Sequence, residues 1–215
     1  MSWLPTNYKA PSAGGDFLNP SKIQDGQSIR IRVLGDFEDP KTAIMGWSCW
    51  ERTGQKNICH RVEYDDEARA ELEAKGFDDL KHFWALLVYN HELRRPQVFE
   101  FTQATIREAL IAMFEDDEFG PPQRHDIKVK KTGKGTNTKY SIVSVGPSEL
   151  SEEIKKQIHS SKCNVANLLT GEPVFAGTVQ QLEKPKPVKR IATPEEEEAI
   201  FGNSQTKEEV EDADY

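Results

Sequence analysis

The sequence predicts a mainly β fold with inserted helices, most simply a small and partly open β-barrel, followed by a disordered acidic C-terminal tail. Three observations support this class. Several short segments alternate apolar and polar residues with the two-residue period of a strand. Helical periods occur only singly between them, so the regular strand–helix alternation of a parallel sheet is missing. Residues 192–215 contain many acids and very few apolar side chains, which is typical of a disordered segment.

The first predicted strand covers residues 28–34, SIRIRVL. It places isoleucine and valine on one face and Arg30 and Arg32 on the other, as a half-buried strand does. A second strand is expected over residues 43–52, and a short acidic helix over residues 65–75.

The middle of the chain predicts a hairpin followed by a helix. Residues 83–90, FWALLVYN, are apolar on both sides, as expected of a central strand, and residues 94–101 return as its partner. Apolar residues then recur at helical spacing, so a helix should lie with one face on the sheet. Phe83, Phe101 and Phe114 are expected to be core residues.

A second hairpin and a further helix complete the predicted domain. Residues 126–131 pair with residues 139–145 in this prediction, and a helix lies near residues 150–158. Residues 1–26, rich in Pro, Gly, Asn and Ser, form an N-terminal arm. Residues 27–182 then form one barrel domain, and residues 183–215 form a Pro- and Lys-rich linker and the acidic disordered tail.

The charge is distributed very unevenly. The formal net charge is −8 over 215 residues, and residues 192–215 hold nine acids against one base. The remainder of the chain is therefore neutral, so the acidity does not argue against a nucleic-acid partner. Residues 124–140 hold six bases against Asp126 alone, and a stripe of this kind can bind phosphates.

Basic and aromatic residues interleave along the predicted strands. Single-stranded nucleic acid needs this mixture, because cations follow the phosphates while flat rings stack on unpaired bases. The alternative is that the rings belong to the core and the cations to a solvated face. The candidate DNA-binding residues are Arg30, Arg32, Trp47, Trp50, Arg52, Arg61, Trp84, Tyr89, Arg94, Arg95, Phe99, Lys128, Lys130, Lys131, Lys134, Lys139 and Tyr140.

Nothing in the sequence indicates catalysis, a metal or a cofactor. The three cysteines are scattered and form no CxxC pair, so we expect neither a disulfide framework nor a structural zinc site. The Gly133-Lys-Gly135 loop lacks the spacing of a P-loop. No apolar run is long enough to span a membrane, and no secretory signal begins the sequence. We therefore expect a cytoplasmic protein that is not an enzyme.

Residues 99–150 resemble the core of bacteriophage single-stranded DNA-binding proteins. The resemblance rests on a helix that follows Thr102, a Gly-x-Pro turn, a D-I-K-V strand and a G-x-G-x-x-T-x-Y hairpin loop. The Gly-x-x-x-Trp step of the second strand and the acidic tail with its terminal aromatic residue are also similar. The matching positions are Gly46, Trp50, Thr102, Ile106, Gly120, Pro122, Asp126, Ile127, Lys128, Gly133, Gly135, Thr138, Tyr140, Asp214 and Tyr215.

The resemblance implies an OB-fold, without the zinc ribbon of some relatives, that coats single-stranded DNA during phage replication, recombination and repair. The protein would then act in the cytoplasm of a host cell. RNA stays an alternative ligand, because a stacking platform does not by itself read a 2′-hydroxyl group. The resemblance also implies that the tail contacts replication or recombination proteins, through Glu208, Glu209, Glu211, Asp212, Asp214 and Tyr215. The rival hypothesis is a protein-binding adaptor or regulatory β-barrel whose acidic tail mimics DNA.

Overall fold

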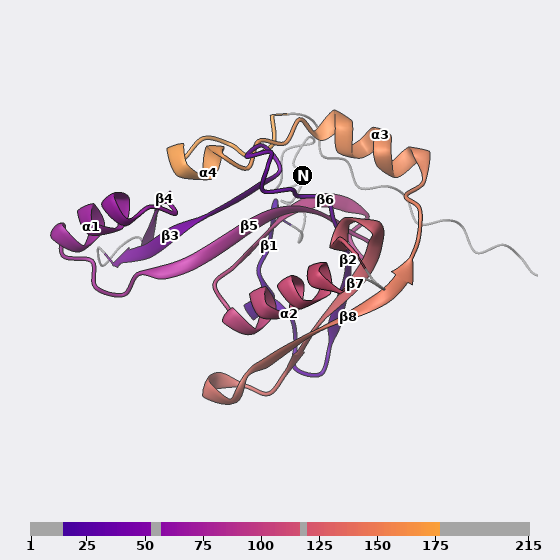
Figure 1. Ribbon diagram of the computed structural model, residues 1–215, viewed down its shortest axis with the longest axis horizontal. Helices are drawn as coiled ribbons and strands as arrows, with labels where there is room; N and C mark the ends of the chain where they lie inside the picture. Colours follow the sequence, from indigo (N-terminus) through magenta and orange to yellow (C-terminus); the bar gives the residue numbers. More distant parts are fainter. Residues whose placement is uncertain (1–14, 53–56, 117–119, 177–215) are drawn as a thin grey trace, which may run out of the picture. The chain divides into compact units, whose positions relative to one another are not determined.

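The computed structural model describes residues 15–52, 57–116 and 120–176, which all belong to one compact unit. A mixed β-sheet forms the framework of this unit, and helices lie on both of its faces (Figure 1). The strands are β1 (Phe17–Leu18), β2 (Ser28–Val33), β3 (Ala43–Arg52), β4 (Asn57–Glu63), β5 (Lys81–Asn90), β6 (Arg95–Phe101), β7 (His125–Thr132) and β8 (Lys139–Pro147). The α-helices are α1 (Asp66–Ala74), α2 (Ala104–Glu115), α3 (Glu152–Ser161) and α4 (Asn167–Thr170).

The strand order is β1-β6-β5-β2-β7-β8, and β3 joins β5 to β4. Every pair is antiparallel except β1 with β6. Across the described residues the sheet is open, with β1 at one end of the order and β8 at the other. These features confirm a mainly β protein with inserted helices.

Strand β5 is the centre of the sheet, which explains why its sequence is apolar on both sides. It pairs with β6 along one edge, and with β3 and then β2 along the other. At Gly46, in the middle of β3, an added Cβ would lie 2.0 Å from the carbonyl oxygen of Val62 and 2.9 Å from the Phe83 ring. Gly46 therefore permits a close approach between neighbours rather than a bulge.

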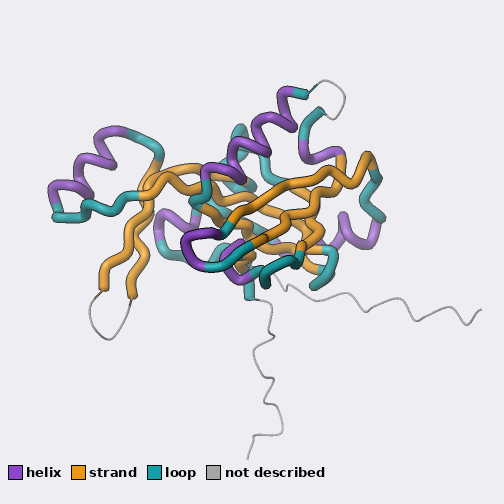
Figure 2. Tube along the Cα trace, turned by 90° about the horizontal axis from the view of Figure 1, so that it is seen from below, coloured by secondary structure: helices purple, strands orange, loops and turns teal. Residues whose placement is uncertain are grey.

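Each face of the sheet has its own core. On one face α2 packs Ile106 and Leu110 against Ile31, Phe99 and other buried residues of the strands. The segment 152–176, which contains α3 and α4, covers part of the other face. It packs Val165, Leu168 and Val174 against apolar residues of β3, β5 and β6. Figure 2 shows these helices on both sides of the strands.

Several packed elements have no clear signal in the sequence. Leu18 and Ile23, in the expected N-terminal arm, are buried in the α2-side core, and β1 pairs with β6. Strand β4 pairs with β3 along its whole length, although its sequence, NICHRVE, is too polar to predict a strand. In Figure 2 the outer part of this hairpin and α1 lie beyond the other strands at the left.

Candidate nucleic-acid interface

Four cations share one exposed face of strands β2, β7 and β8. Arg30 lies directly opposite Lys128 in the ladder, and Lys130 lies between Ser28 and Ser141. Lys139 follows on the same side of β8, because side chains alternate along a strand and Lys139 pairs with Thr132. The three lysines are exposed, and the Arg30 side chain is 43% exposed. We call Arg30, Lys128, Lys130 and Lys139 the basic face.

No exposed acid interrupts the basic face in the described residues of these three strands. The only carboxylate on this side is Asp126, and it is buried. Between the cations lie the hydroxyl residues Ser28, Thr132 and Ser141, together with Val143, which is 55% exposed. The three exposed lysines of the basic face therefore present an excess of positive charge to solvent.

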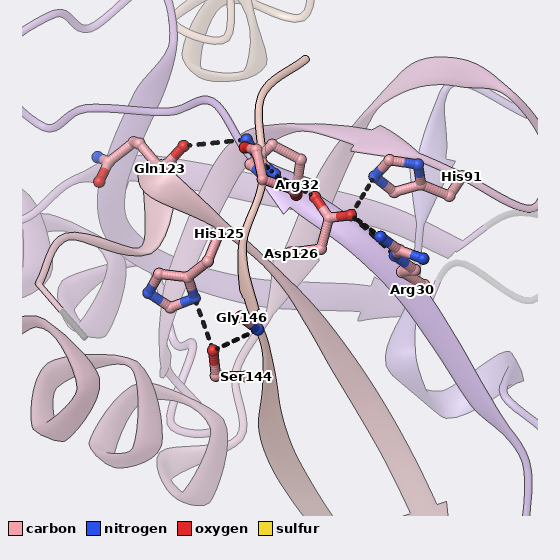
Figure 3. A network of polar contacts seen from close by, with 9 residues as sticks. Arg30, Arg32, His91, Gln123, His125, Asp126, Ser144 and Gly146 are labelled. Atoms are coloured by element: carbon pink, nitrogen blue, oxygen red, sulfur yellow. Dashed lines mark hydrogen bonds and ion pairs between the residues drawn. The ribbon is translucent and has the colours of Figure 1, made fainter. Parts of the chain in front are cut away.

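Asp126 anchors the inner edge of the basic face (Figure 3). Arg30 Nη2 lies 2.5 Å from Asp126 Oδ2, and Arg32 Nη2 lies 2.7 Å from Oδ1. His91 Nε2 lies 3.1 Å from Oδ2, so three nitrogen groups converge on one carboxylate. The carboxylate thus fixes the start of β7 beside the middle of β2 and orients Arg30 toward the exposed lysines.

Arg32 is a structural residue rather than a DNA contact. Its side chain is only 3% exposed. Beyond Asp126, its Nη2 donates to the carbonyl oxygen and the hydroxyl of Ser148, at 2.9 and 2.5 Å. The guanidinium therefore ties β2 to the chain that leaves β8. A buried arginine held in this way cannot reach a phosphate, which corrects its assignment to the binding surface.

The protonation of this cluster follows from its burial and its charges. Burial raises the pKa of Asp126, but the hydrogen bond from Arg30 and the charges of His91 and Arg32 outweigh it and leave that pKa below its usual value. Burial lowers the pKa of His91, although Asp126 opposes that effect. At neutral pH the cluster therefore holds one carboxylate, two guanidinium groups and a neutral imidazole.

A second group of basic and aromatic residues lies on the β3–β4 hairpin and α1, which we call the aromatic arm. Trp47 stacks on Tyr64 at a centroid distance of 5.4 Å, and the Arg69 guanidinium lies 4.6 Å from the Trp47 ring centroid. Arg61 forms two hydrogen bonds with Glu100, at 2.8 and 2.9 Å. Arg61 and Arg69 are thus paired or stacked.

Trp50 is the exception within the aromatic arm. Trp50 is 60% exposed. It lines a shallow cleft of about 470 Å³ whose charged residues are both basic and acidic: Arg52, Lys81, Glu51, Asp78 and Asp79. Arg52 is exposed as well. Of the candidate rings, Trp50 is therefore the one that is most free to stack on a base.

Most other candidate rings and arginines are engaged in the fold. Tyr89 and Phe99 are 1% and 0% exposed, so they cannot stack on a base in this conformation. Trp84 is half-buried beside Phe37, and Tyr140 packs on the α2-side core. Arg95 pairs with Asp16, and Arg94 is half-buried. Lys131 donates a hydrogen bond to the Ser21 carbonyl oxygen. Lys134, by contrast, is exposed at the tip of the β7–β8 hairpin.

One expectation about the core is wrong in an informative way. Phe83 and Phe101 are buried, but Phe114 is 62% exposed at the end of α2. Helical spacing places Phe114 near Leu110, but Leu110 packs into the core whereas Phe114 stays outside it. The Phe114 ring instead lines an apolar groove beside α2.

The basic face and Trp50 lie at opposite ends of the same side of the sheet. Along β5 this side carries Phe83, Ala85 and Leu87, which the segment 152–176 covers. The ladder places Trp50 beyond one end of that covered stretch and Arg30 beyond the other. Residues that interleave in the sequence are therefore separated in space.

The remaining predictions concern metals, membranes and the tail. No group of three or more His, Cys, Asp or Glu side chains is arranged to hold a metal ion in the part of the chain that the structure describes. Over the same ranges, no helix has the length and apolar character needed to span a bilayer. The tail residues Glu208–Tyr215 lie outside the described residues.

The residues that sequence reasoning missed are Asp126 as an anchor, His91 and Ser148. Asp126 had one signal, because it is the only acid in a strongly basic stretch. Its pairing with Arg30 and Arg32 depends on the β2–β7 register, which no local pattern encodes.

Comparison with known proteins gives no match. No protein-family model, curated protein or solved structure is similar enough to the chain to assign a family or a fold relative. The function must therefore be argued from the site itself.

Proposed function

We propose that the chain is a single-stranded DNA-binding protein without enzymatic activity, which contacts phosphates through its basic face. The single observation that carries this proposal is the row of Arg30, Lys128, Lys130 and Lys139 with no exposed acid on the same face of β2, β7 and β8. Cations fixed on paired strands can follow a phosphate backbone without reading its sequence.

The proposed fold is a partly open OB-type barrel. Two observations support it. Strand β2 pairs on both sides, with β5 and with β7, as a barrel's shared strand does, and α2 contacts β8. OB-folds bind oligonucleotides on exposed strands and loops, which is where the basic face lies.

The exposed Trp50 supplies the stacking element of the proposal. A base that stacks on this ring would lie close to Arg52, which is two residues away on the same side of β3. In the proposed protein the acidic tail recruits replication or recombination proteins, as the resemblance implies.

A competition assay tests this function. Labelled oligo-dT bound to the full chain is displaced with unlabelled single-stranded DNA, duplex DNA and RNA of equal length. We expect single-stranded DNA to compete best, with quenching of Trp50 fluorescence on binding. Equal competition by duplex DNA, or no binding to any of the three, would favour the adaptor hypothesis.

A further inference from the structure

The α2 side of the sheet carries an apolar groove that the proposed DNA site does not use. It has a volume of about 330 Å³ and lies between the loop after β2 and the outer face of α2. Its walls include Phe37, Trp84, Ile111, Phe114, Pro122 and Gln123. Phe37, Ile111 and Phe114 are 39%, 43% and 62% exposed, which is unusual for a cluster of large apolar side chains.

Two polar atoms in the walls of the groove lack partners. The indole NH of Trp84 and the side-chain carbonyl oxygen of Gln123 are both buried without a hydrogen bond in the described part of the chain. A buried indole NH normally finds an acceptor. The Gln123 amide is otherwise ordered, since its nitrogen donates to the Gly35 carbonyl at 2.9 Å. Both atoms are fully buried in this conformation, so a ligand in the groove contacts the surrounding rings rather than these two atoms.

The charged residues that line the groove are both acidic. They are Asp36 and Glu38, on the loop that forms one wall, and both are exposed. This charge disfavours a nucleotide and favours a cationic ligand. An aromatic groove with an acidic rim fits a proline-rich basic peptide, because aromatic-lined grooves recognise polyproline II segments and the acids attract its positive charge.

The chain itself contains a segment of this chemistry. Residues 184–190 read KPKPVKR, with two prolines, four bases and no acid. A residue before a proline is biased toward extended or polyproline II geometry, so the Lys-Pro-Lys-Pro sequence favours the conformation that such grooves bind. No other stretch of the sequence combines proline and positive charge so densely.

We propose that the apolar groove binds the proline-rich segment 184–190 of a second copy of this chain. The proposal rests on the proposed function in one respect, because a protein that coats a strand places copies side by side. The groove lies on the opposite side of the sheet from the basic face. It therefore remains accessible while phosphates occupy the basic face, and the contact links neighbouring copies.

The first test uses a fluorescent peptide with the sequence of residues 183–191, titrated with the full chain in the absence of DNA. We expect saturable binding that weakens with salt. Phe114→Ser should weaken it about tenfold, whereas Phe17→Ser, which removes an exposed ring outside the groove, should not change it.

The peptide offers its own matched control. Replacing both prolines with alanine keeps the charge and should weaken binding at least about tenfold, because the polyproline II preference and the ring contacts are lost. The proposal would be overturned if the peptide did not bind at a chain concentration of about 1 mM. It would also be overturned if the alanine peptide bound as tightly as the natural peptide and the Phe114→Ser chain bound the natural peptide as tightly as the unaltered chain does.

The second test identifies the source of the segment. Sedimentation velocity of the full chain over a concentration series should show self-association. The double variant Pro185→Ala, Pro187→Ala and the single variant Phe114→Ser should each reduce it. Peptide binding without self-association would overturn the second copy as the occupant. Neither test contains DNA, so their results do not depend on the DNA-binding proposal. If the chain binds the peptide but fails to bind oligo-dT in the competition assay, only the DNA-binding proposal is contradicted.

Discussion

The basic face and the aromatic arm contain the same kinds of residue and use them in opposite ways. In the aromatic arm Arg61 is paired with Glu100, and Arg69 is shared between Glu73 and the Trp47 ring. Among the described residues of β2, β7 and β8 the only carboxylate, Asp126, is buried, and three lysines remain exposed. The difference shows that the placement of the carboxylates, and not the number of cations, decides which region can attract a phosphate backbone.

Under the proposed function the two regions contact different parts of the DNA. Exposed cations without rings act on phosphates at any sequence, whereas an exposed ring such as Trp50 acts on bases. The segment 152–176 covers the sheet between them. A DNA strand that contacts both the basic face and Trp50 must therefore pass around the segment 152–176. This path would add several nucleotides to the length of DNA that one protein covers.

The largest expected effect concerns the anchor of the basic face. Asp126→Asn leaves Arg32 buried without its carboxylate, so the free energy of unfolding should fall by about 3–5 kcal/mol. Urea unfolding measures it. The matched change, Glu100→Gln on β6, removes the partner of Arg61 in the aromatic arm and should cost about 1 kcal/mol or less, because Arg61 and Glu100 are partly exposed. Equal losses would remove the proposed distinction between the two carboxylates.

The next effect concerns Trp50. Trp50→Ala should weaken binding to oligo-dT by about 1–3 kcal/mol, the value of one stacked base. The ring is exposed, so thermal stability should hardly change. Fluorescence anisotropy with a parallel melting curve separates the two quantities. Phe99→Ala is the contrasting variant, since loss of a buried ring should lower stability by about 3–5 kcal/mol. Unchanged affinity for Trp50→Ala would confine the DNA contact to the basic face.

The smallest effect is a pH dependence of stability that originates beside the basic face. The folded-state pKa of His91 is below the ordinary value of about 6.5, so the unfolded chain binds more protons below that pH. Stability should therefore fall as the pH drops from about 7 to 5, by at most about 1.4 kcal/mol per pH unit for this group. His82, whose pKa is also lowered by burial and by Arg107, adds to the slope.

The control for this dependence is His91→Gln, which should flatten part of the slope between about pH 7 and 5. Asp126 contributes separately. Its folded-state pKa is below the ordinary value of about 3.9, so its contribution is present above that pH and is lost as the pH falls through the lower, folded-state value. An unchanged slope in His91→Gln would show that His91 does not titrate as its contacts imply.

The sequence predicts the strands well where one face is buried, and the site only in part. The alternation in residues 28–34 locates β2, and the apolar run in residues 83–90 locates the central strand β5. Strand β4 escapes prediction because it gains its order from pairing with β3, not from a hydrophobic face of its own.

The site is harder to predict because register and burial are tertiary properties. Arg30 and Arg32 have equal standing in the sequence, yet one is 43% exposed and the other 3%. The segment after β8 makes the difference, because Ser148 covers Arg32. Lys128 and Lys130, by contrast, alternate with Ile127 and Val129, and this pattern alone predicts their exposure.

The central claim is that the basic face carries the phosphate contacts. The most direct measurement is the affinity for oligo-dT as a function of salt, for the natural sequence and for Lys128→Ala with Lys130→Ala and Lys139→Ala. If each lysine neutralises one phosphate, the slope of log K against log salt should become less negative by about 2, with a loss on the order of 100-fold near 0.1 M salt. The control variant replaces Lys75, Lys155 and Lys156, which are exposed outside the basic face. The account predicts a wild-type slope and affinity for this control, and an equal loss in both triple variants would contradict it.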